Sequence, residues 1–411
     1  MKPDASRALE LAFRRSSARL VAQLYARLGG TRLDLAEDAT QFSLLQATRQ
    51  WPVRGVPDAP DAWLARVAHN RLTDLVRGAR ATVDAGDDEL SDAPVNPPER
   101  LSQEFGDDEL RLLFATCHPA LSVEVQVTLC LKLACGLSVR EIARALLSEE
   151  TAIAQRLVRA RKTLQALGGA LEVPGGAALG PRLLAVHQAL YVLFNEGYER
   201  TDGESLVDVS LCAEALRLVE GVVSQPVTST PEGHALAALF SFKAATLDSR
   251  VDGSGSFVPA ARRGPARPEL IARGVLHLKH AMGTALSRWH LEAELALIHA
   301  QGPSDTWPWR RILSLYDDLV RLDPSPLVAL NRLVAVAEVE GPHEALAALE
   351  RLPGLEGLEA YPWRHAIEGS LHRRLGALSA ARRAFLRAAD FAISEPQRRF
   401  LLSEARACAD A

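Results

Sequence analysis

The chain has 411 residues, of which 48% are hydrophobic and 24% charged, with a formal net charge of −4. This length exceeds one compact core, so we expect roughly two to four domains in a soluble globular protein. Aromatic residues are scarce at 5%, whereas Ala, Leu and Arg are abundant, which favours packed helices over sheets. The net charge neither requires nor excludes a nucleic-acid partner.

The distribution of charge is more informative than its sum. Residues 1–80 hold thirteen Lys or Arg against eight Asp or Glu, whereas residues 81–109 hold ten acidic residues and one basic residue, Arg100. This pattern predicts a modestly basic module that is followed by an acidic tether.

The cysteines and the N-terminal residues indicate in which cellular compartment the protein is expected. The five cysteines show no CxxC or other paired spacing, so we expect reduced and mostly buried thiols. Residues 1–11 lack an apolar core and a small-residue cleavage site, so no signal peptide is expected. No stretch of about eighteen uninterrupted apolar residues occurs, so no membrane contact is expected. We therefore expect a cytoplasmic protein.

Apolar residues recur at helical spacing along almost the whole chain, which predicts an all-α fold. Three segments rich in Pro, Gly or charge interrupt the pattern, at residues 81–98, 168–181 and 248–268. The third reads as a long loop within the C-terminal part. These breaks predict a helical module, a linker, a second module, a linker and a long helical extension, over residues 1–80, 81–103, 104–167, 168–180 and 181–411.

Two amphipathic helices are predicted in the first module. Residues 34–50 begin with acids and carry a Leu44-Leu45 ridge. In residues 61–80, the apolar face and the polar face separate cleanly. A polar stripe with regularly spaced arginines and an amide suits a nucleic-acid strand, although taken alone it is more often a solvated face. The apolar face holds Leu64, Ala68, Leu72 and Leu75, and the polar face holds Arg66, Asn70, Thr73, Arg77 and Arg80.

Residues 137–157 predict a helix-turn-helix. Ser138 and Glu141 have the spacing of a capping box, which starts a helix just after the Gly136 turn. Ala143 is small enough for two crossing helices to touch. A second helix with polar and basic residues on its outer face fits a major groove, although an ordinary hairpin with a solvated face remains the alternative. That face carries Thr151, Gln155, Arg156, Arg159 and Lys162, and the shared core carries Ile142, Leu146, Ile153 and Leu157.

The extension contains helix pairs that are typical of tetratricopeptide-like repeats of about 34 residues. Turns are predicted at Gly341 and Gly376, and small residues such as Gly369, Ala381 and Ala388 are expected to let two antiparallel helices approach closely while Phe385 fills the groove. Generic helical hairpins remain the alternative. We predict the repeats from about residue 309. Further upstream, a polar-aromatic cluster either lines a ligand pocket or forms a satisfied helix end; it consists of Tyr191, Asn195, Glu196 and Tyr198.

Several motifs resemble the extracytoplasmic-function branch of the sigma-70 family. They are AEDATQFSLLQA, PDAWLARVAHNRLTDLVRGAR and LVRARKTL, in the family's order and separation. The resemblance covers region two, about residues 11–80, and region four, about residues 104–167. In the extension, YVLFNEGY at 191–198 and LCAEALRL at 211–218 resemble a subgroup with C-terminal helical repeats. In region two the matching positions are Trp63, Leu64, Ala68, Asn70, Asp74 and Arg77.

The resemblance implies a sigma factor that binds core RNA polymerase and directs promoter-specific transcription initiation. Region two would read the −10 element as melted single strand, and region four would read the −35 element as duplex. The implied polymerase contacts are Asp34, Asp38, Gln41 and Leu45. The implied or predicted DNA contacts are Arg66, Asn70, Arg71, Arg77, Thr151, Gln155, Arg156, Arg159 and Lys162, with His69 a weaker candidate.

The sequence also bears on metal binding, catalysis and two alternative functions. Histidine pairs such as His290 with Glu294, or His365 with His372, lack a third ligand at helical spacing, so no metal site is predicted. No phosphate loop, dinucleotide fingerprint or GxSxG occurs, so neither a cofactor nor catalysis is expected. One alternative is a helix-turn-helix regulator that never joins polymerase and whose repeats sense a ligand or partner. Another is a repeat scaffold. The extension is expected to regulate the sigma module in cis.

Overall fold

The computed structural model describes residues 16–29, 32–83, 108–146, 148–166, 179–200, 206–283, 286–302 and 304–409. Predictions for residues 1–11, for most of the acidic tether and of the 168–180 linker, and for Leu147 lie outside these ranges. Over the ranges described, the chain is helical, and its extended pairing is limited to an isolated bridge between Val251 and Phe257. The predicted all-α fold is confirmed.

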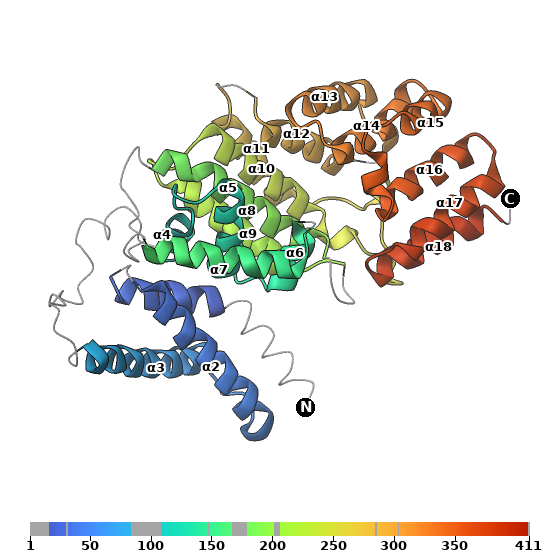
Figure 1. Cartoon of the computed structure of the whole chain (residues 1–411). Coiled ribbons are helices and arrows are strands. Elements are labelled where there is room, and N and C mark those ends of the chain that lie inside the picture. Colours follow the sequence, from blue (N-terminus) through green and yellow to red (C-terminus); the bar gives the residue numbers. More distant parts are fainter. Residues whose placement is uncertain are drawn as a thin grey trace. The chain divides into compact units, whose positions relative to one another are not determined.

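The chain divides into two compact units. The first consists of Met1–Leu193 with Ser224–Thr228, and the second of Phe194–Val223 with Ser229–Ala411. After a helix at residues 16–27, the first unit contains α2 (Leu33–Arg54), α3 (Pro60–Val83), α4 (Asp108–Thr116), α5 (Val123–Leu133), α6 (Val139–Ala145) and α7 (Glu150–Ala166), labelled in Figure 1.

The long helices α2 and α3 pack on each other through small and aromatic side chains. Ala47 and Leu64 are fully buried at this contact, and Trp51 meets Trp63 edge to face with ring centroids 5.7 Å apart. Edge-to-face packing adds to the burial of two large apolar side chains. The predicted apolar face of α3 is confirmed at Leu64, Ala68 and Leu72, whereas Leu75 is half-buried.

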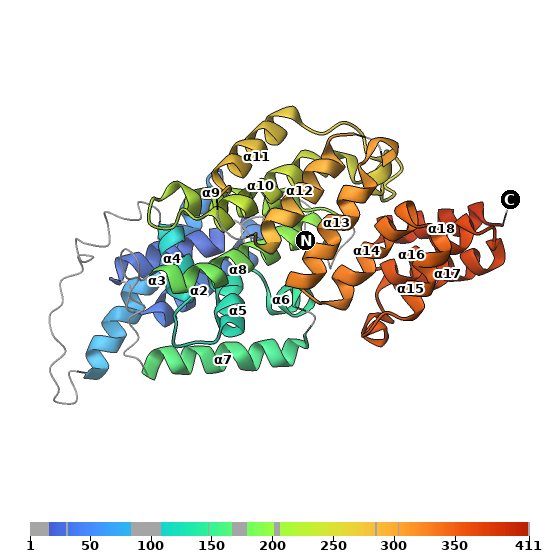
Figure 2. The same ribbon diagram turned by 90° about the horizontal axis from the view of Figure 1, so that it is seen from above.

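The helices α6 and α7 form the pair predicted from residues 137–157. The Ser138 hydroxyl accepts from the Glu141 backbone N–H at 3.1 Å, and the Glu141 carboxylate accepts from the Ser138 N–H at 2.8 Å. This is the predicted capping box, and it satisfies two N–H groups that the helix itself leaves unbonded. Ile142, Ala143 and Ile153 are buried between the helices, and Figure 2 shows α7 straight along its length.

The helix α8 (Gly180–Tyr198) begins in the first unit and ends in the second. Near its end Gly197 approaches the next helix so closely that an added Cβ would lie 2.8 Å from the Cys212 nitrogen. The other helices of the second unit are α9 (Val209–Ser224), α10 (Pro231–Ala245), α11 (Pro268–His280), α12 (Arg288–Ala300), α13 (Trp309–Leu322), α14 (Pro326–Val339), α15 (Pro342–Glu350), α16 (Pro362–Arg374), α17 (Leu378–Asp390) and α18 (Glu395–Ala407).

The predicted turns of the extension are confirmed. Gly341, between α14 and α15, has φ of 105°, and Gly376, between α16 and α17, has φ of 76°. Both values favour glycine, because a Cβ is strained there. The Phe385 ring packs on Gly369, where an added Cβ would meet it at 3.1 Å, as the repeat pattern predicts. Figure 1 shows α16, α17 and α18 in succession at the end of the chain.

The predicted loop at 248–268 is also confirmed. It contains the isolated bridge and the short 3₁₀ turns η2 (Leu247–Ser249) and η3 (Ala260–Arg262), and α11 starts at its end. All five cysteines are buried free thiols, as expected. None of the helices in the described ranges combines the length and apolar character needed to span a bilayer.

Candidate functional site

The residues assigned to polymerase binding form one face of α2. Asp34, Asp38, Gln41 and Leu45 are four, three and four positions apart, a spacing that keeps side chains on one side of a helix. Asp38 and Gln41 are exposed, and Leu45 is 47% exposed although it is apolar. Asp34 is half-buried and accepts two bonds from Arg32, at 2.7 and 3.0 Å. The Arg32 guanidinium lowers the pKa of Asp34.

The opposite face of α2 explains why this stripe points outward. Ala36, Ala39, Leu44 and Ala47 are buried, so the packing against α3 fixes the rotation of the helix about its axis. Only one residue of the predicted Leu44-Leu45 ridge is therefore in the core. Leu45 remains available to a partner, which makes its substitution a clean probe of binding.

The predicted polar face of α3 is presented to solvent. Arg66, Asn70 and Arg77 are exposed, and they lie four and seven positions apart along one side of the helix. Arg71 is different, since it is half-buried and its guanidinium lies 5.0 Å from the centroid of the Phe42 ring. His69 is exposed and its Nδ1 lies 2.9 Å from an Arg27 nitrogen. Among the side chains that the structure describes, Arg66, Asn70 and Arg77 therefore form the exposed part of the predicted polar face.

On α7, four of the five predicted DNA contacts are exposed: Thr151, Gln155, Arg159 and Lys162. Arg156 departs from the predicted outer face. Its side chain is only 16% exposed, donates to the Thr128 hydroxyl at 3.2 Å and pairs with Glu124.

The reason for this departure is the position of α5, which brings a hydroxyl and a carboxylate within reach of Arg156. A guanidinium in such a fork gains charge-assisted hydrogen bonds. Arg156 thus joins two helices of the first unit, and Arg159 and Lys162 carry the exposed positive charge of α7.

Sequence reasoning missed an ion pair between α2 and α7. Glu37 is 7% exposed and accepts a charge-assisted hydrogen bond from Arg161, which is 124 positions away. Burial raises the pKa of Glu37, and the nearby cations Arg161 and Lys132 offset part of that rise. The signal in the sequence is an acid on the side of α2 that carries mainly small and apolar residues, which calls for a partner.

The polar-aromatic cluster at the end of α8 is split by the structure. Asn195 accepts from Lys243 at 3.3 Å, and Glu196 is 3% exposed. Tyr198, in contrast, lines a cavity of about 510 Å³ inside the second unit. The sequence could indicate the tyrosine but not the residues that meet it there, because they come from the loop at 250–263 and from later helices.

Two segments of the chain match known protein families. Residues 13–82 match sigma-70 region 2, and residues 182–282 match a family of unknown function, DUF6596. The chain is 38% identical over 367 residues to an uncharacterized protein of Rhizobium meliloti (strain 1021). The alignment covers 87% of this chain and 86% of the relative. The chain belongs to one family with that protein, and its region 2 supports membership of the sigma-70 family.

Proposed function

We propose that the chain is a sigma factor of the extracytoplasmic-function type, which acts in the cytoplasm. It binds core RNA polymerase through α2 and directs initiation at specific promoters. In this proposal α3 reads the −10 element as single strand, and the α6–α7 helix-turn-helix reads the −35 element as duplex. The domain boundaries predicted from the sequence, and the tetratricopeptide-like nature of the later helix pairs, form part of the same proposal.

The observation that carries the proposal is the exposed face of α2 within the region 2 match. An apolar side chain that is 47% exposed, flanked by an exposed acid and an exposed amide, fits a protein-binding surface. The exposed Arg66, Asn70 and Arg77 on α3 fit a strand of nucleic acid beside it. A DNA-binding regulator that acts without polymerase has no use for the α2 face.

Replacement of Leu45 by Arg tests the polymerase contact. We expect at least a hundredfold loss of core polymerase affinity in a pull-down or by light scattering, because a charge would enter a desolvated apolar contact. The control is Val53→Arg, on the same helix and 84% exposed but outside the stripe. If Leu45→Arg keeps both its helicity and its core affinity, the assignment of α2 is refuted.

The extension, residues 181–411, is proposed to regulate this module in cis. In α8, Arg182 is 3% exposed and donates to the Phe114 carbonyl at 2.8 Å, while the same helix continues into the second unit. α8 is therefore the segment of the chain that contacts α4 and continues into the second unit. The acidic residues 81–109 add a negative charge that competes with DNA for basic faces, an effect that salt weakens.

Truncation tests the regulation, with transcription from a cognate promoter as the readout. Chains that end after Leu167 and after Leu193 are compared with the full chain, because only the longer one keeps Arg182. A large gain or a large loss of activity supports regulation, and its sign shows whether the extension inhibits or assists. Unchanged activity and core affinity in both truncations, with and without cell extract, would leave the extension without a regulatory role.

A further inference from the structure

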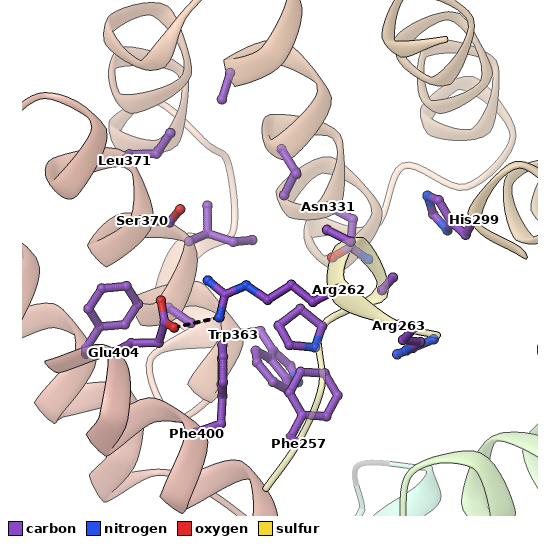
Figure 3. A pocket seen from close by; sticks show the side chains of 18 of the residues that line it. Phe257, Arg262, Arg263, His299, Asn331, Trp363, Ser370, Leu371, Phe400 and Glu404 are labelled. Atoms are coloured by element: carbon purple, nitrogen blue, oxygen red, sulfur yellow. Dashed lines mark hydrogen bonds and ion pairs between the residues drawn. The ribbon is translucent and has the colours of Figure 1, made fainter. Parts of the chain in front are cut away.

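The cavity of about 510 Å³ in the second unit is lined by segments far apart in the sequence. Its walls come from the end of α8, the loop at 250–263, and helices α12, α14, α16, α17 and α18. Figure 3 shows side chains from these segments directed toward a common space. The volume lies within the range of pockets that hold small organic molecules, roughly 300–1,000 Å³.

Aromatic rings form one side of the cavity. Phe257 packs against Trp363 and Phe400, with ring centroids 4.9 and 5.5 Å apart. Tyr198 and Phe385 also line the space. Because the rings are tilted against one another, they form an apolar wall, which favours an apolar ligand body.

Positive charge is in excess around the cavity. Its lining includes five arginines and three glutamates, and each glutamate is already engaged. Glu404 is shared by Arg262 and Arg373, with a 3.0 Å bond to Arg262. Glu338 pairs with Arg374 at 2.8 Å. Because five arginines face three glutamates, these groups give the cavity lining a net charge of +2.

Arg250 is the most deeply buried of these arginines, with 2% exposure. Its guanidinium lies 3.7 Å from the centroid of Tyr198, and its Nη2 is 3.5 Å from Glu199. Glu199 also accepts from Trp363 at 3.1 Å, so it is a shared acceptor. Among the described residues, Nε of Arg250 has no hydrogen-bond acceptor, and Nη2 has only the 3.5 Å ion pair with Glu199. A buried guanidinium with unused donors calls for an acceptor from outside the chain.

Two neutral polar side chains complete the lining. Asn331 of α14 and Ser370 of α16 face the cavity, labelled in Figure 3, and within the described ranges neither side chain forms a hydrogen bond with the protein. A few polar groups on an otherwise apolar wall are what orient a small ligand.

We propose that this cavity binds a small organic anion with an apolar body, in which one carboxylate or phosphate group meets the arginines and the body packs against the Phe257, Trp363 and Phe400 rings. The site depends on the second unit alone. It is therefore independent of whether the chain joins polymerase.

Two titratable groups agree with a positive cavity. Burial opposes ionisation of Tyr198, yet Arg250, Arg263 and Lys243 outweigh it and lower the pKa of this tyrosine to about 8. Burial, assisted by Arg263 and Lys243, lowers the pKa of His299 to about 4. His299 is neutral at pH 7, so the positive charge comes from the arginines.

Isothermal titration of the full chain with 1-naphthoate and with 1-naphthyl phosphate tests the proposal. Uncharged 1-naphthalenemethanol, which has the same ring system, is the matched control ligand. We expect at least one of the two anions to bind at one site per chain, at least tenfold more tightly than the alcohol. Loss of a charge-assisted contact to a buried arginine justifies that factor.

Three variants locate the binding. Ser370→Trp fills the cavity and should abolish binding, and Arg263→Met should weaken it at least tenfold. Arg273→Met removes an arginine that pairs with Glu220 away from the cavity and should have no effect. Circular dichroism identifies any variant that has lost its fold. The proposal is overturned if neither anion binds, if the alcohol binds equally well, or if folded Ser370→Trp binds as the natural chain does.

Discussion

The candidate nucleic-acid faces of the first unit and the cavity of the second present their arginines in opposite ways. In the first unit, Arg66, Arg77 and Arg159 are exposed on helix faces. In the second, Arg250 is 2% exposed and Arg263 donates to the Tyr198 hydroxyl at 2.8 Å inside a cavity. An exposed row of cations matches a polymer with repeated phosphates, whereas an enclosed pair with aromatic neighbours matches a small anion. Burial of the arginine, more than its presence, distinguishes the two kinds of partner.

Charge reversal on α3 should produce the largest effect, a loss of promoter opening. We expect Arg66→Glu with Arg77→Glu to reduce promoter opening by roughly tenfold per residue, because each change removes a phosphate contact and adds repulsion. Permanganate footprinting of the −10 region measures the opening. Reversal of the exposed Arg382 and Arg383 on α17 is the matched control. Equal opening in both double variants would remove the distinction between the faces.

The packing of the second unit can be tested at Gly274, where an added Cβ would lie 2.4 Å from the Phe242 ring. Gly274→Ala should lower the free energy of unfolding of this unit by about 1–3 kcal/mol, the usual cost of overpacking. Thermal unfolding followed by calorimetry measures it. Gly253→Ala, at a site with no atom within 4 Å, should change little. An equal shift for both variants would contradict the close contact of α10 with α11.

On α7 the expected effect is smaller and depends on salt. Replacing the exposed Arg159 and Lys162 by Ala should reduce the salt slope of −35 duplex binding by about 0.9 for each lost phosphate contact. Arg156→Ala should change the slope less, since this residue is occupied by Glu124 and Thr128. Fluorescence anisotropy over a range of salt concentrations gives both slopes. A larger change from Arg156 than from the exposed pair would contradict the geometry.

The smallest expected effect is the ionisation of Tyr198, measured by its absorbance. Its pKa is lowered from 10.0 to about 8, so its phenolate should appear in the absorbance difference between the natural chain and Tyr198→Phe with a midpoint near pH 8. Burial raises the pKa of Tyr316 to about 12, which keeps that residue silent in this range. In Arg250→Met the midpoint of the Tyr198 titration should move upward. An unchanged midpoint would show that Arg250 does not lower the pKa of Tyr198.

The sign of the linked stability follows from the same shift. A phenol whose pKa is lower in the folded chain than in the unfolded chain stabilises the fold only where the folded form has lost its proton. The contribution of Tyr198 should therefore grow as the pH rises from 8 to 10 and vanish below 8. Denaturant unfolding of the natural chain and Tyr198→Phe across this range measures it.

Much of the fold could be predicted because it depends on local chemistry. The Ser138 capping box, the glycine turns at Gly341 and Gly376, and the buried face of α3 each follow from a few neighbouring residues. The hydrophobic pattern alone could not separate exposed Leu45 from buried Leu44, because both belong to one apolar ridge, and only the family resemblance pointed to Leu45. Only the packing of α2 on α3 decides between them.

The candidate sites were less predictable where distant segments meet. Arg156 was assigned to the outer face, and only the position of α5 shows that it turns inward. The pairing of Glu37 with Arg161 joins residues 124 positions apart. The cavity likewise combines Tyr198 with Arg250 and with helices near the end of the chain. Spacing along one helix cannot reveal such contacts, since they depend on tertiary packing.

The most direct test of the account is run-off transcription with purified core polymerase on a library of promoter fragments. If the chain is a sigma factor, core polymerase and chain together should initiate at specific fragments, and neither should do so alone. Leu45→Arg should remove this activity, and Val53→Arg should retain it. Identical transcripts from core polymerase with and without the natural chain, while the chain alone still binds duplex DNA, would contradict the account and favour a regulator that does not join polymerase.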